Sequence, residues 1–276
     1  MPTVTVTSWR RSSTFRALRD FFRRRQPEER PTRTITITSW RRPFYLRQVI
    51  ESLRQNDTTG YTLYVALEPD GLPETLNVAR SAAEFVDTRI LVNSRNLGVR
   101  ENPFNLLSYV FEHEGSQGNV YLEEDTVVSA DALRLVNWYF EKVDKSNLLS
   151  LHLFNYESDS EKHHDLFVGK EFNSLGIAMT REQWGRWYRS YWHDDVITKK
   201  VFPDLIGWDW AMRAVLALHE DLGTLTPRCV RSNHIGREGG VHCTPEFHDE
   251  KFASLRINEA PDVSHYRIES ARHAQS

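Results

Sequence analysis

Strand patterns and helix patterns alternate along the first half of the chain. TITIT at Thr34 alternates polar and apolar residues, which predicts a strand, and RPFYLRQVIESLRQN behind it has apolar residues at helical spacing. Further strands are expected in YTLYVALE, TRILVNS and NVYLEED, and further helices between them in ETLNVARSAAEF and NPFNLLSYVFEHE. Strands that are joined through helices by short links pair in parallel. The order therefore predicts an α/β fold with a mostly parallel central sheet and helices on both faces.

The second half of the chain is less regular. Strands are expected in NLLSLHLF, SLGIAMT and GTLTPRCVRSN, and helices in REQWGRWYRSYW and GWDWAMRAVLALHE. HDDVITKKVFPD is expected to form a loop, and HIGREGGVHCTPEF a glycine-rich loop. No second domain boundary is visible, so residues 32–260 are expected to form one domain and residues 261–276 a polar, frayed tail.

One phrase occurs twice near the start, as TVTVTSWRR from Thr3 and as TITITSWRR from Thr34. Because only the second copy is followed by a helix and another strand, it is expected to be the first core strand. The first copy belongs to a basic leader, residues 1–31. It either adds an edge strand or competes for the same position in the sheet, and a duplication without a structural role is the open alternative.

The charge of the chain is unevenly distributed. The net charge is −3, yet residues 10–33 carry nine Arg against Asp20, Glu28 and Glu29. Such a segment suits a polyanion, including DNA or RNA, or a membrane surface, and a solvated extension is the alternative. No apolar run is long enough to span a membrane, and no signal peptide is visible. With Cys229 and Cys243 expected to be reduced, a cytoplasmic protein is expected.

Three carboxylates, Glu123, Glu124 and Asp125, stand at the end of the strand expected in NVYLEED. Ligands of open α/β sheets bind at the carboxyl ends of the strands. Clustered carboxylates disfavour one another's ionisation unless a cation lies among them, and hard oxygen ligands suit Mg²⁺ or Mn²⁺ bound together with a diphosphate. The triplet therefore predicts a metal site, and a solvated acidic turn that caps the next helix is the alternative.

Three segments carry motifs that occur together in one group of enzymes: the acidic triplet, GWDWAMR, and the closing segment from Pro227 to Asn258. They resemble the GT-A glycosyltransferases, and specifically the family 13 group of N-acetylglucosaminyltransferase I. That group has a Glu-Asp-Asp motif at a strand end, a Trp-Asp-Asp-Trp stretch, and a Pro…Arg…Gly-Arg-x-Gly-x-x-His pattern, which PRCVRSNHIGREGGVH follows without a gap. The resemblance covers residues 34–258. It implies the GT-A fold, metal-dependent inverting transfer and a UDP-sugar donor, with UDP-GlcNAc as the donor of that group.

The resemblance also implies roles for single residues. Asp125 is the direct ligand of Mn²⁺ (or Mg²⁺), and Asp209 is the catalytic base. Arg41 follows the first core strand, where the group has a nucleotide-contacting Arg, and Asp70, in preference to Glu68, ends the second strand, where a uracil-contacting Asp lies. The other residues expected to contact nucleotide or donor are Glu123, Glu124, Trp208, Arg237 and His242.

Asp209 and Arg237 suit this chemistry on their own. An inverting transfer needs a base that takes the acceptor hydroxyl proton, and Asp209 stands between two Trp at a helix start, where it is either that base or a helix cap. The leaving UDP develops charge that a metal and an Arg can stabilise, and Arg237 lies in a glycine-flanked loop able to close over a diphosphate. His242 of the same loop either contacts phosphate or is an ordinary surface His.

These features lead to a main functional hypothesis and alternatives. The main hypothesis is a metal-dependent inverting glycosyltransferase that moves a sugar, GlcNAc or another hexose, from a UDP-sugar to an acceptor hydroxyl. The first alternative keeps this chemistry and acts on a hydroxylated base of DNA or RNA, held by the Arg-rich segment. A non-catalytic sugar-nucleotide-binding protein is a further alternative. A nucleotidyltransferase fits GWDW and GREGG poorly.

Overall fold

The computed structural model describes residues 2–9, 32–240, 243–260 and 263–269. Residues 10–31 of the predicted basic segment 10–33, together with His242, lie outside the described residues. In the part of the chain that is described, no helix is long and apolar enough to cross a membrane. Cys229 and Cys243 are both free thiols.

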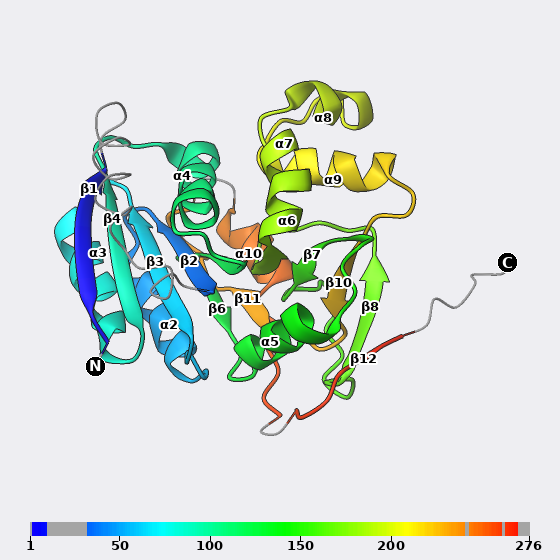
Figure 1. The fold of residues 1–276 in the computed structure, drawn as a ribbon, viewed down its shortest axis with the longest axis horizontal. Coiled ribbons are helices and arrows are strands. Elements are labelled where there is room, and N and C mark those ends of the chain that lie inside the picture. Colours follow the sequence, from blue (N-terminus) through cyan, green and yellow to red (C-terminus); the bar gives the residue numbers. More distant parts are fainter. Residues whose placement is uncertain (1, 10–31, 241–242, 261–262, 270–276) are drawn as a thin grey trace, which may run out of the picture.

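The first half of the chain builds five parallel neighbours of a ten-stranded sheet (Figure 1). Their order across the sheet is β1-β4-β3-β2-β5, and each adjacent pair is parallel. The strands are β1 (Val4–Trp9), β2 (Arg33–Ser39), β3 (Tyr61–Leu67), β4 (Asp87–Asn93) and β5 (Gly118–Glu123). The predicted α/β fold with a mostly parallel sheet is confirmed, and the carboxyl ends of β2, β3 and β5 meet at one edge.

The second half extends the same sheet with mixed strand directions. β9 (Ile177–Thr180) is antiparallel to both β5 and β7 (Leu148–His152), and β7 is parallel to β10 (Gly223–Pro227). β8 (Asp165–Gly169) and β12 (Arg267–Ile268) close this side. A separate pair, β6 (Thr126–Val128) and β11 (Ser232–His234), is antiparallel. The expected strand GTLTPRCVRSN is therefore two strands, β10 and β11, that lie in different sheets.

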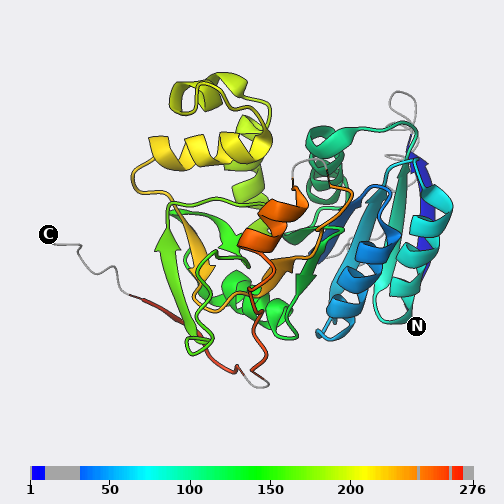
Figure 2. The same ribbon diagram turned by 180° about the vertical axis from the view of Figure 1, so that it is seen from behind.

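Helices cover both faces of the sheet, as the pattern predicts. One buried cluster joins the sheet to α2 (Pro43–Arg54), α3 (Leu72–Ser81) and α5 (Ala132–Lys142). The other cluster joins the sheet to α4 (Gly98–Ser108), which continues as a π-helix over Tyr109–His113, and to α9 (Trp208–Leu218). It also includes one continuous helical segment made of α6 (Arg181–Gln183), a π-helix over Trp184–Tyr188, and α7 (Arg189–Tyr191). Seen from behind in Figure 2, α10 (Pro245–Lys251) lies between the parallel half of the sheet and the second half.

Two predictions about irregular segments are wrong. The expected loop HDDVITKKVFPD contains α8 (Asp195–Val201), because the Asp194 carboxylate accepts hydrogen bonds from the backbone N–H groups of Val196 and Ile197 and so caps a helix start. The expected frayed tail contains β12, which pairs with β8. Both elements are short and polar, so hydrophobic periodicity does not reveal them.

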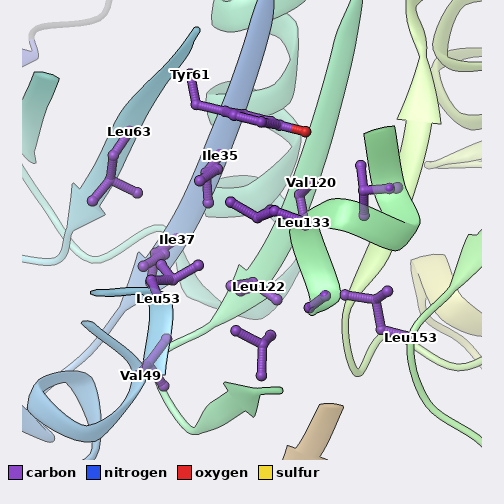
Figure 3. Packing of buried hydrophobic residues seen from close by; sticks show 14 of the residues in the cluster. Ile35, Ile37, Val49, Leu53, Tyr61, Leu63, Val120, Leu122, Leu133 and Leu153 are labelled. Carbon is purple, nitrogen blue, oxygen red and sulfur yellow. The ribbon is translucent and has the colours of Figure 1, made fainter. Parts of the chain in front are cut away.

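The repeated phrase occupies two very different positions. In β2, Ile35 and Ile37 are both fully buried in the core, and Figure 3 shows Ile37 close to Leu53 of α2. Thr34 belongs to the alternate set of side chains on the opposite face of the sheet, where its hydroxyl lies 3.1 Å from that of Ser116. The first copy, β1, is an edge strand that pairs with β4 alone among the described strands. The edge-strand alternative is therefore the one that the structure adopts.

The repeat supplies a matched pair of substitutions, because Val6 and Ile37 hold the same position in the two copies. Ile37 is fully buried and Val6 is 42% exposed. Ile37→Ala should lower the free energy of unfolding by about 2–5 kcal/mol, as large-to-small changes in a core do. Val6→Ala should cost less than about 1 kcal/mol. Urea denaturation of the two variants checks this, and equal costs would contradict the assignment of core and edge.

Candidate active site

A cavity of about 360 Å³ opens at the carboxyl ends of β2, β3 and β5. This is the edge at which α/β sheets bind ligands. Its walls come from the ends of these strands, from the start of α4, and from the loop after β11. The lining residues are Thr38, Ser39, Trp40, Arg42, Glu68, Asn96, Gly98, Val99, Asn102, Pro103, Tyr121, Glu123, Glu124, Asp125, His234, Gly239, Gly240 and Cys243.

The acidic triplet lies in this cavity, as predicted. Glu123 is the last residue of β5, and Glu124 and Asp125 form the turn that leads into β6. Glu124 and Asp125 are buried, at 6% and 2% exposure. Carboxylates so far from water need compensating partners. The alternative of a solvated acidic turn is therefore wrong.

Arg42 and His234 are these partners, and sequence reasoning missed both. The Arg42 guanidinium donates to Glu124 Oε1 from Nε at 2.8 Å and from Nη2 at 2.6 Å, and Nη2 also lies 2.6 Å from Asp125 Oδ2. His234 Nε2 lies 3.2 Å from the same Asp125 oxygen. The pairing of β11 with β6, in which His234 is opposite Thr126, brings this His beside Asp125. The basic pair Arg41–Arg42 after TITITSW was a signal for a basic residue here, but the family resemblance assigned the site role to Arg41 and not to Arg42.

The three carboxylates differ in pKa. Burial, helped by the charges of Asp125 and Glu124, raises the pKa of Glu123 to about 8. Burial and the charge of Asp125 raise the pKa of Glu124 to about 7, against the lowering effect of Arg42. Burial acts on Asp125 in the same direction, but the hydrogen bonds and charges of His234 and Arg42 outweigh it and hold the pKa of Asp125 below its usual value. The negative charge of the triplet is therefore concentrated on Asp125.

The loop after β11 fits closely around Arg42 and Asp125. A Cβ on Gly236 would lie 2.2 Å from Asp125 Oδ2 and 2.9 Å from Arg42 Nη1, which leaves no room for a side chain. A Cβ on Gly239 would lie 3.5 Å from Arg42 Cδ, and one on Gly240 would lie 3.5 Å from Nη1. The glycines of the predicted glycine-rich loop thus surround Arg42, and Gly236 is needed for close approach.

Asp209 lies at the start of α9 and close to the acidic triplet. Its charge contributes to the raised pKa of Glu123. Gly207 is the N-cap, with φ of 137°, and a Cβ there would lie 2.7 Å from Asp209 Oδ1. Among the described residues, the Asp209 carboxylate makes no hydrogen bond, so the alternative of a hydrogen-bonding helix cap is not the arrangement found. Asp209 as a whole is half-buried.

Trp208 packs behind the cavity instead of lining it. Its ring stacks on Trp192 at 4.2 Å with an interplanar angle of 3°, and it meets Tyr121 and Phe172 edge-on. Tyr121 is itself a wall of the cavity. In this arrangement Trp208 is buried in the core, and it supports the wall beside Asp209.

Arg41 and Asp70 lie together at the rim of the cavity. The Arg41 guanidinium is 3.4 Å from Asp70 Oδ2 and 4.7 Å from the centre of the Trp40 ring. Asp70 also accepts hydrogen bonds from Trp40 Nε1 and Asn96 Nδ2. The less favoured Glu68 is buried and accepts from the N–H groups that open α4, a structural role.

Arg237 does not line the cavity. Its Nε and Nη2 each donate to Asp249 of α10 at 2.9 Å, and the side chain is about half exposed. The acidic triplet, Asp209 and the Arg41–Asp70 pair are therefore brought together at one edge, whereas Arg237 is held on the outer side of its loop.

Asp125 is the residue best placed to hold a divalent cation, and His234 Nε2 lies beside its carboxylate. Asp125 Oδ1 and His234 Nδ1 are both buried without a hydrogen-bond partner. Within the described ranges, no group of three or more His, Cys, Asp or Glu is arranged to hold a metal ion alone. Magnesium sites that serve nucleotides use one or two carboxylates and complete their coordination with substrate phosphates and water. The residues present therefore fit a cation that is bound jointly with a diphosphate.

Comparison with known proteins identifies the fold. Neither a protein-family model nor a curated protein matches the sequence. Among solved structures, S. aureus TarS 1–349 in complex with UDP-GlcNAc matches with a TM-score of 0.54 at 10% identity, over 79% of this chain and 64% of that one. A second structure of S. aureus TarS 1–349 matches with a TM-score of 0.52 at 9% sequence identity, over 73% of this chain and 59% of that one. The mannosyltransferase PcManGT from Pyrobaculum calidifontis, in complex with GDP-Man and Mn²⁺, has a TM-score of 0.48 at 11%, over 78% and 61%.

These neighbours are glycosyltransferases of the GT-A type, and the chain spans less than two thirds of the length of each. The similarity is to the GT-A type in general and does not single out the family 13 group. At such low identity, it is the arrangement of strands and helices that is shared. The chain has the GT-A fold, with its cavity at the carboxyl edge of the parallel strands.

The close approach of Gly236 generates a prediction with an internal control. Gly236→Ala should push the Arg42–Asp125 pair apart and lower the free energy of unfolding by about 1–3 kcal/mol, the usual cost of overpacking. Gly240→Ala makes an ordinary contact, so its effect should be near zero, or stabilising by up to about 1 kcal/mol because the unfolded chain loses freedom. Urea denaturation measures both, and a neutral Gly236→Ala would contradict the geometry.

Proposed function

We propose that this protein is a glycosyltransferase that moves a sugar from a nucleotide-diphosphate donor to an acceptor hydroxyl. The observation that carries the proposal is the acidic triplet at the carboxyl edge of a GT-A sheet, with Asp125 ionised, buried and provided with one unpartnered oxygen. Most buried polar side-chain atoms have a hydrogen-bond partner, so an unpartnered oxygen on a buried carboxylate supports a ligand there. Donor hydrolysis across a panel of UDP-sugars with Mn²⁺ tests the proposal, and hydrolysis of none of them would count against it.

The donor is proposed to be a UDP-sugar, with GlcNAc or another hexose as the sugar. Support comes from the family 13 resemblance and from the fold shared with TarS, whose structure contains UDP-GlcNAc. Trp40, Arg41 and Asp70 form a cluster at the rim beside the ends of β2 and β3, and we assign the uridine to this side. Glu123 and Glu124 are assigned to the donor side of the cavity.

Mn²⁺ (or Mg²⁺) is proposed as the cofactor, held by Asp125 with His234 as the second protein ligand. When bound, the ion supplies positive charge to the diphosphate as the leaving UDP develops negative charge. Asp125 is suited to this because its pKa is held low, so that it is ionised at neutral pH. Arg237 stays a candidate for further charge at the leaving group, and that role requires its release from Asp249.

Asp209 is proposed as the general base of an inverting transfer. Its carboxylate oxygen would accept the proton of the acceptor hydroxyl while the hydroxyl oxygen attacks the anomeric carbon from the face opposite UDP. Asp209 lies near enough to the acidic triplet for its charge to contribute to the raised pKa of Glu123. No described residue occupies its oxygens by hydrogen bonding.

Replacement of Asp125 tests the cation site. Asp125→Ala should abolish Mn²⁺-dependent binding of UDP in calorimetry, because the ionised ligand of the triplet is gone. The control is Asp57→Ala, which removes an exposed carboxylate from a turn remote from the cavity. It should bind UDP like the wild type. Unchanged affinity of Asp125→Ala for UDP in the presence of Mn²⁺ would show that this assignment is mistaken.

Replacement of Asp209 tests the base. Asp209→Asn keeps the shape of the side chain and removes its basicity, so the rate of transfer should fall by roughly 10²- to 10⁴-fold. The affinity for UDP, measured by calorimetry, should barely change. A near wild-type transfer rate, or a product that keeps the donor's anomeric configuration in NMR, would contradict an inverting mechanism through Asp209.

A further inference from the structure

Arg42 is the basic side chain in closest contact with the acidic triplet. Its Nη2 lies 2.6 Å from both Glu124 Oε1 and Asp125 Oδ2, and its Nε donates to Glu124 as well. The side chain is 15% exposed, and the remaining nitrogen, Nη1, is buried without a hydrogen-bond partner. A guanidinium has five N–H donors, so part of its capacity is unused at the centre of the cavity wall.

One oxygen of Asp125 and one nitrogen of Arg42 are buried without a hydrogen-bond partner, and their groups carry opposite charges. Asp125 Oδ2 is taken by Arg42 and His234, whereas Asp125 Oδ1 has no partner; Arg42 Nη2 is taken by two carboxylates, whereas Nη1 has none. An unsatisfied buried polar atom is costly, so each suggests a ligand. A cation suits the oxygen, and an anion suits the nitrogen.

Arg42 lines the cavity together with Gly239 and Gly240 of the glycine-rich loop. Gly236, Gly239 and Gly240 pass beside the guanidinium without side chains. On the other side, the ring of Tyr45 lies 5.6 Å from the guanidinium carbon. The Tyr45 hydroxyl accepts a hydrogen bond from the backbone N–H of Glu238 at 3.1 Å, which connects the glycine-rich loop to α2, the helix that Arg42 precedes as N-cap.

We propose that the Arg42 guanidinium is a resident counter-cation. It offsets the charge of Asp125 and Glu124 when no metal is bound, competes with the divalent metal, and turns to the donor diphosphate when metal and donor bind. The proposal rests on the proposed function of the same cavity. It follows from charge: a divalent ion at Asp125 repels a guanidinium 2.6 Å from that carboxylate. A phosphate oxygen offers the displaced guanidinium an equivalent charge-assisted partner.

A structural role for Arg42 is the competing explanation. An ion pair between the start of α2 and the turn after β5 would connect the two elements, and buried pairs of this kind occur for that reason alone. The two explanations differ in what happens to ligand binding when the charge is removed. A structural ion pair predicts weaker or unchanged metal binding, whereas a competing cation predicts tighter metal binding and weaker nucleotide binding.

The test uses Arg42→Gln and two separate readouts. Mn²⁺ binding without nucleotide, followed by electron paramagnetic resonance, should become tighter, on the order of tenfold, because the competing charge is gone. UDP binding at saturating Mn²⁺, followed by calorimetry, should weaken about ten- to hundredfold, the loss expected for a hydrogen bond between charged groups. These opposite changes are the signature of the proposal.

Arg54→Gln is the matched control, because it removes the same charge from the far end of α2, the helix that Arg42 precedes as N-cap. Arg54 pairs with Glu51 and Glu84 and lies outside the cavity. Neither its Mn²⁺ affinity nor its UDP affinity should change. If Arg42→Gln and Arg54→Gln changed these affinities equally, the cause would be the net charge of the protein, and the proposal would be overturned.

The remaining outcomes also decide the matter. Unchanged or weaker Mn²⁺ binding by Arg42→Gln overturns the competition, and unchanged UDP binding overturns the contact with phosphate. If Arg42→Gln does not fold, Arg42→Lys keeps the charge but not the fork of donors. It should bind Mn²⁺ like the wild type and UDP more weakly. If wild-type protein binds Mn²⁺ but no UDP, the proposed function fails, and the Mn²⁺ comparison alone still tests the competition.

Discussion

The architecture of the site depends on compensation of the negative charge at the end of β5. Glu124 and Asp125 are buried where the carboxyl ends of the parallel strands meet, and buried carboxylates persist only with partners. Arg42 comes from the start of α2, and His234 from the strand that pairs with β6. The triplet thus connects the two halves of the chain. It adds a polar contact that fixes the loop after β11 beside the turn after β5.

The parallel half of the fold could be predicted from sequence because its signals are local. TITITS alternates apolar and polar residues, so Ile35 and Ile37 enter the core while the threonines bond on the other face. The triplet directly follows the apolar run NVYL, so its place at the carboxyl edge of the sheet could also be predicted. The second half was harder, because β8 and β11 are short and their partners, β10 and β6, are remote in sequence or antiparallel. Such pairings are decided by tertiary contacts.

The choice between Arg41 and Arg42 shows where sequence reasoning stops. Arg41 has a φ of 62°, a left-handed conformation that is uncommon for a residue with a side chain. This turn sends Arg41 outward to Asp70 and Trp40, and it leaves Arg42 facing Glu124 and Asp125. Nothing in SWRRP specifies that rotation. His234 was missed for a related reason: its neighbour Asp125 lies 109 positions earlier, and only the β6–β11 register brings them together.

The glycine-rich loop is best understood from what its glycines approach. The sequence suggested that they allow a loop to move and bring Arg237 to a diphosphate. In the structure, Gly236 has no space for a Cβ because Asp125 and Arg42 occupy that volume, and Arg237 is engaged by Asp249. Tyr45 holds the next residue, Glu238, through its backbone N–H. The position of the loop therefore depends on the Arg42–Asp125 contact.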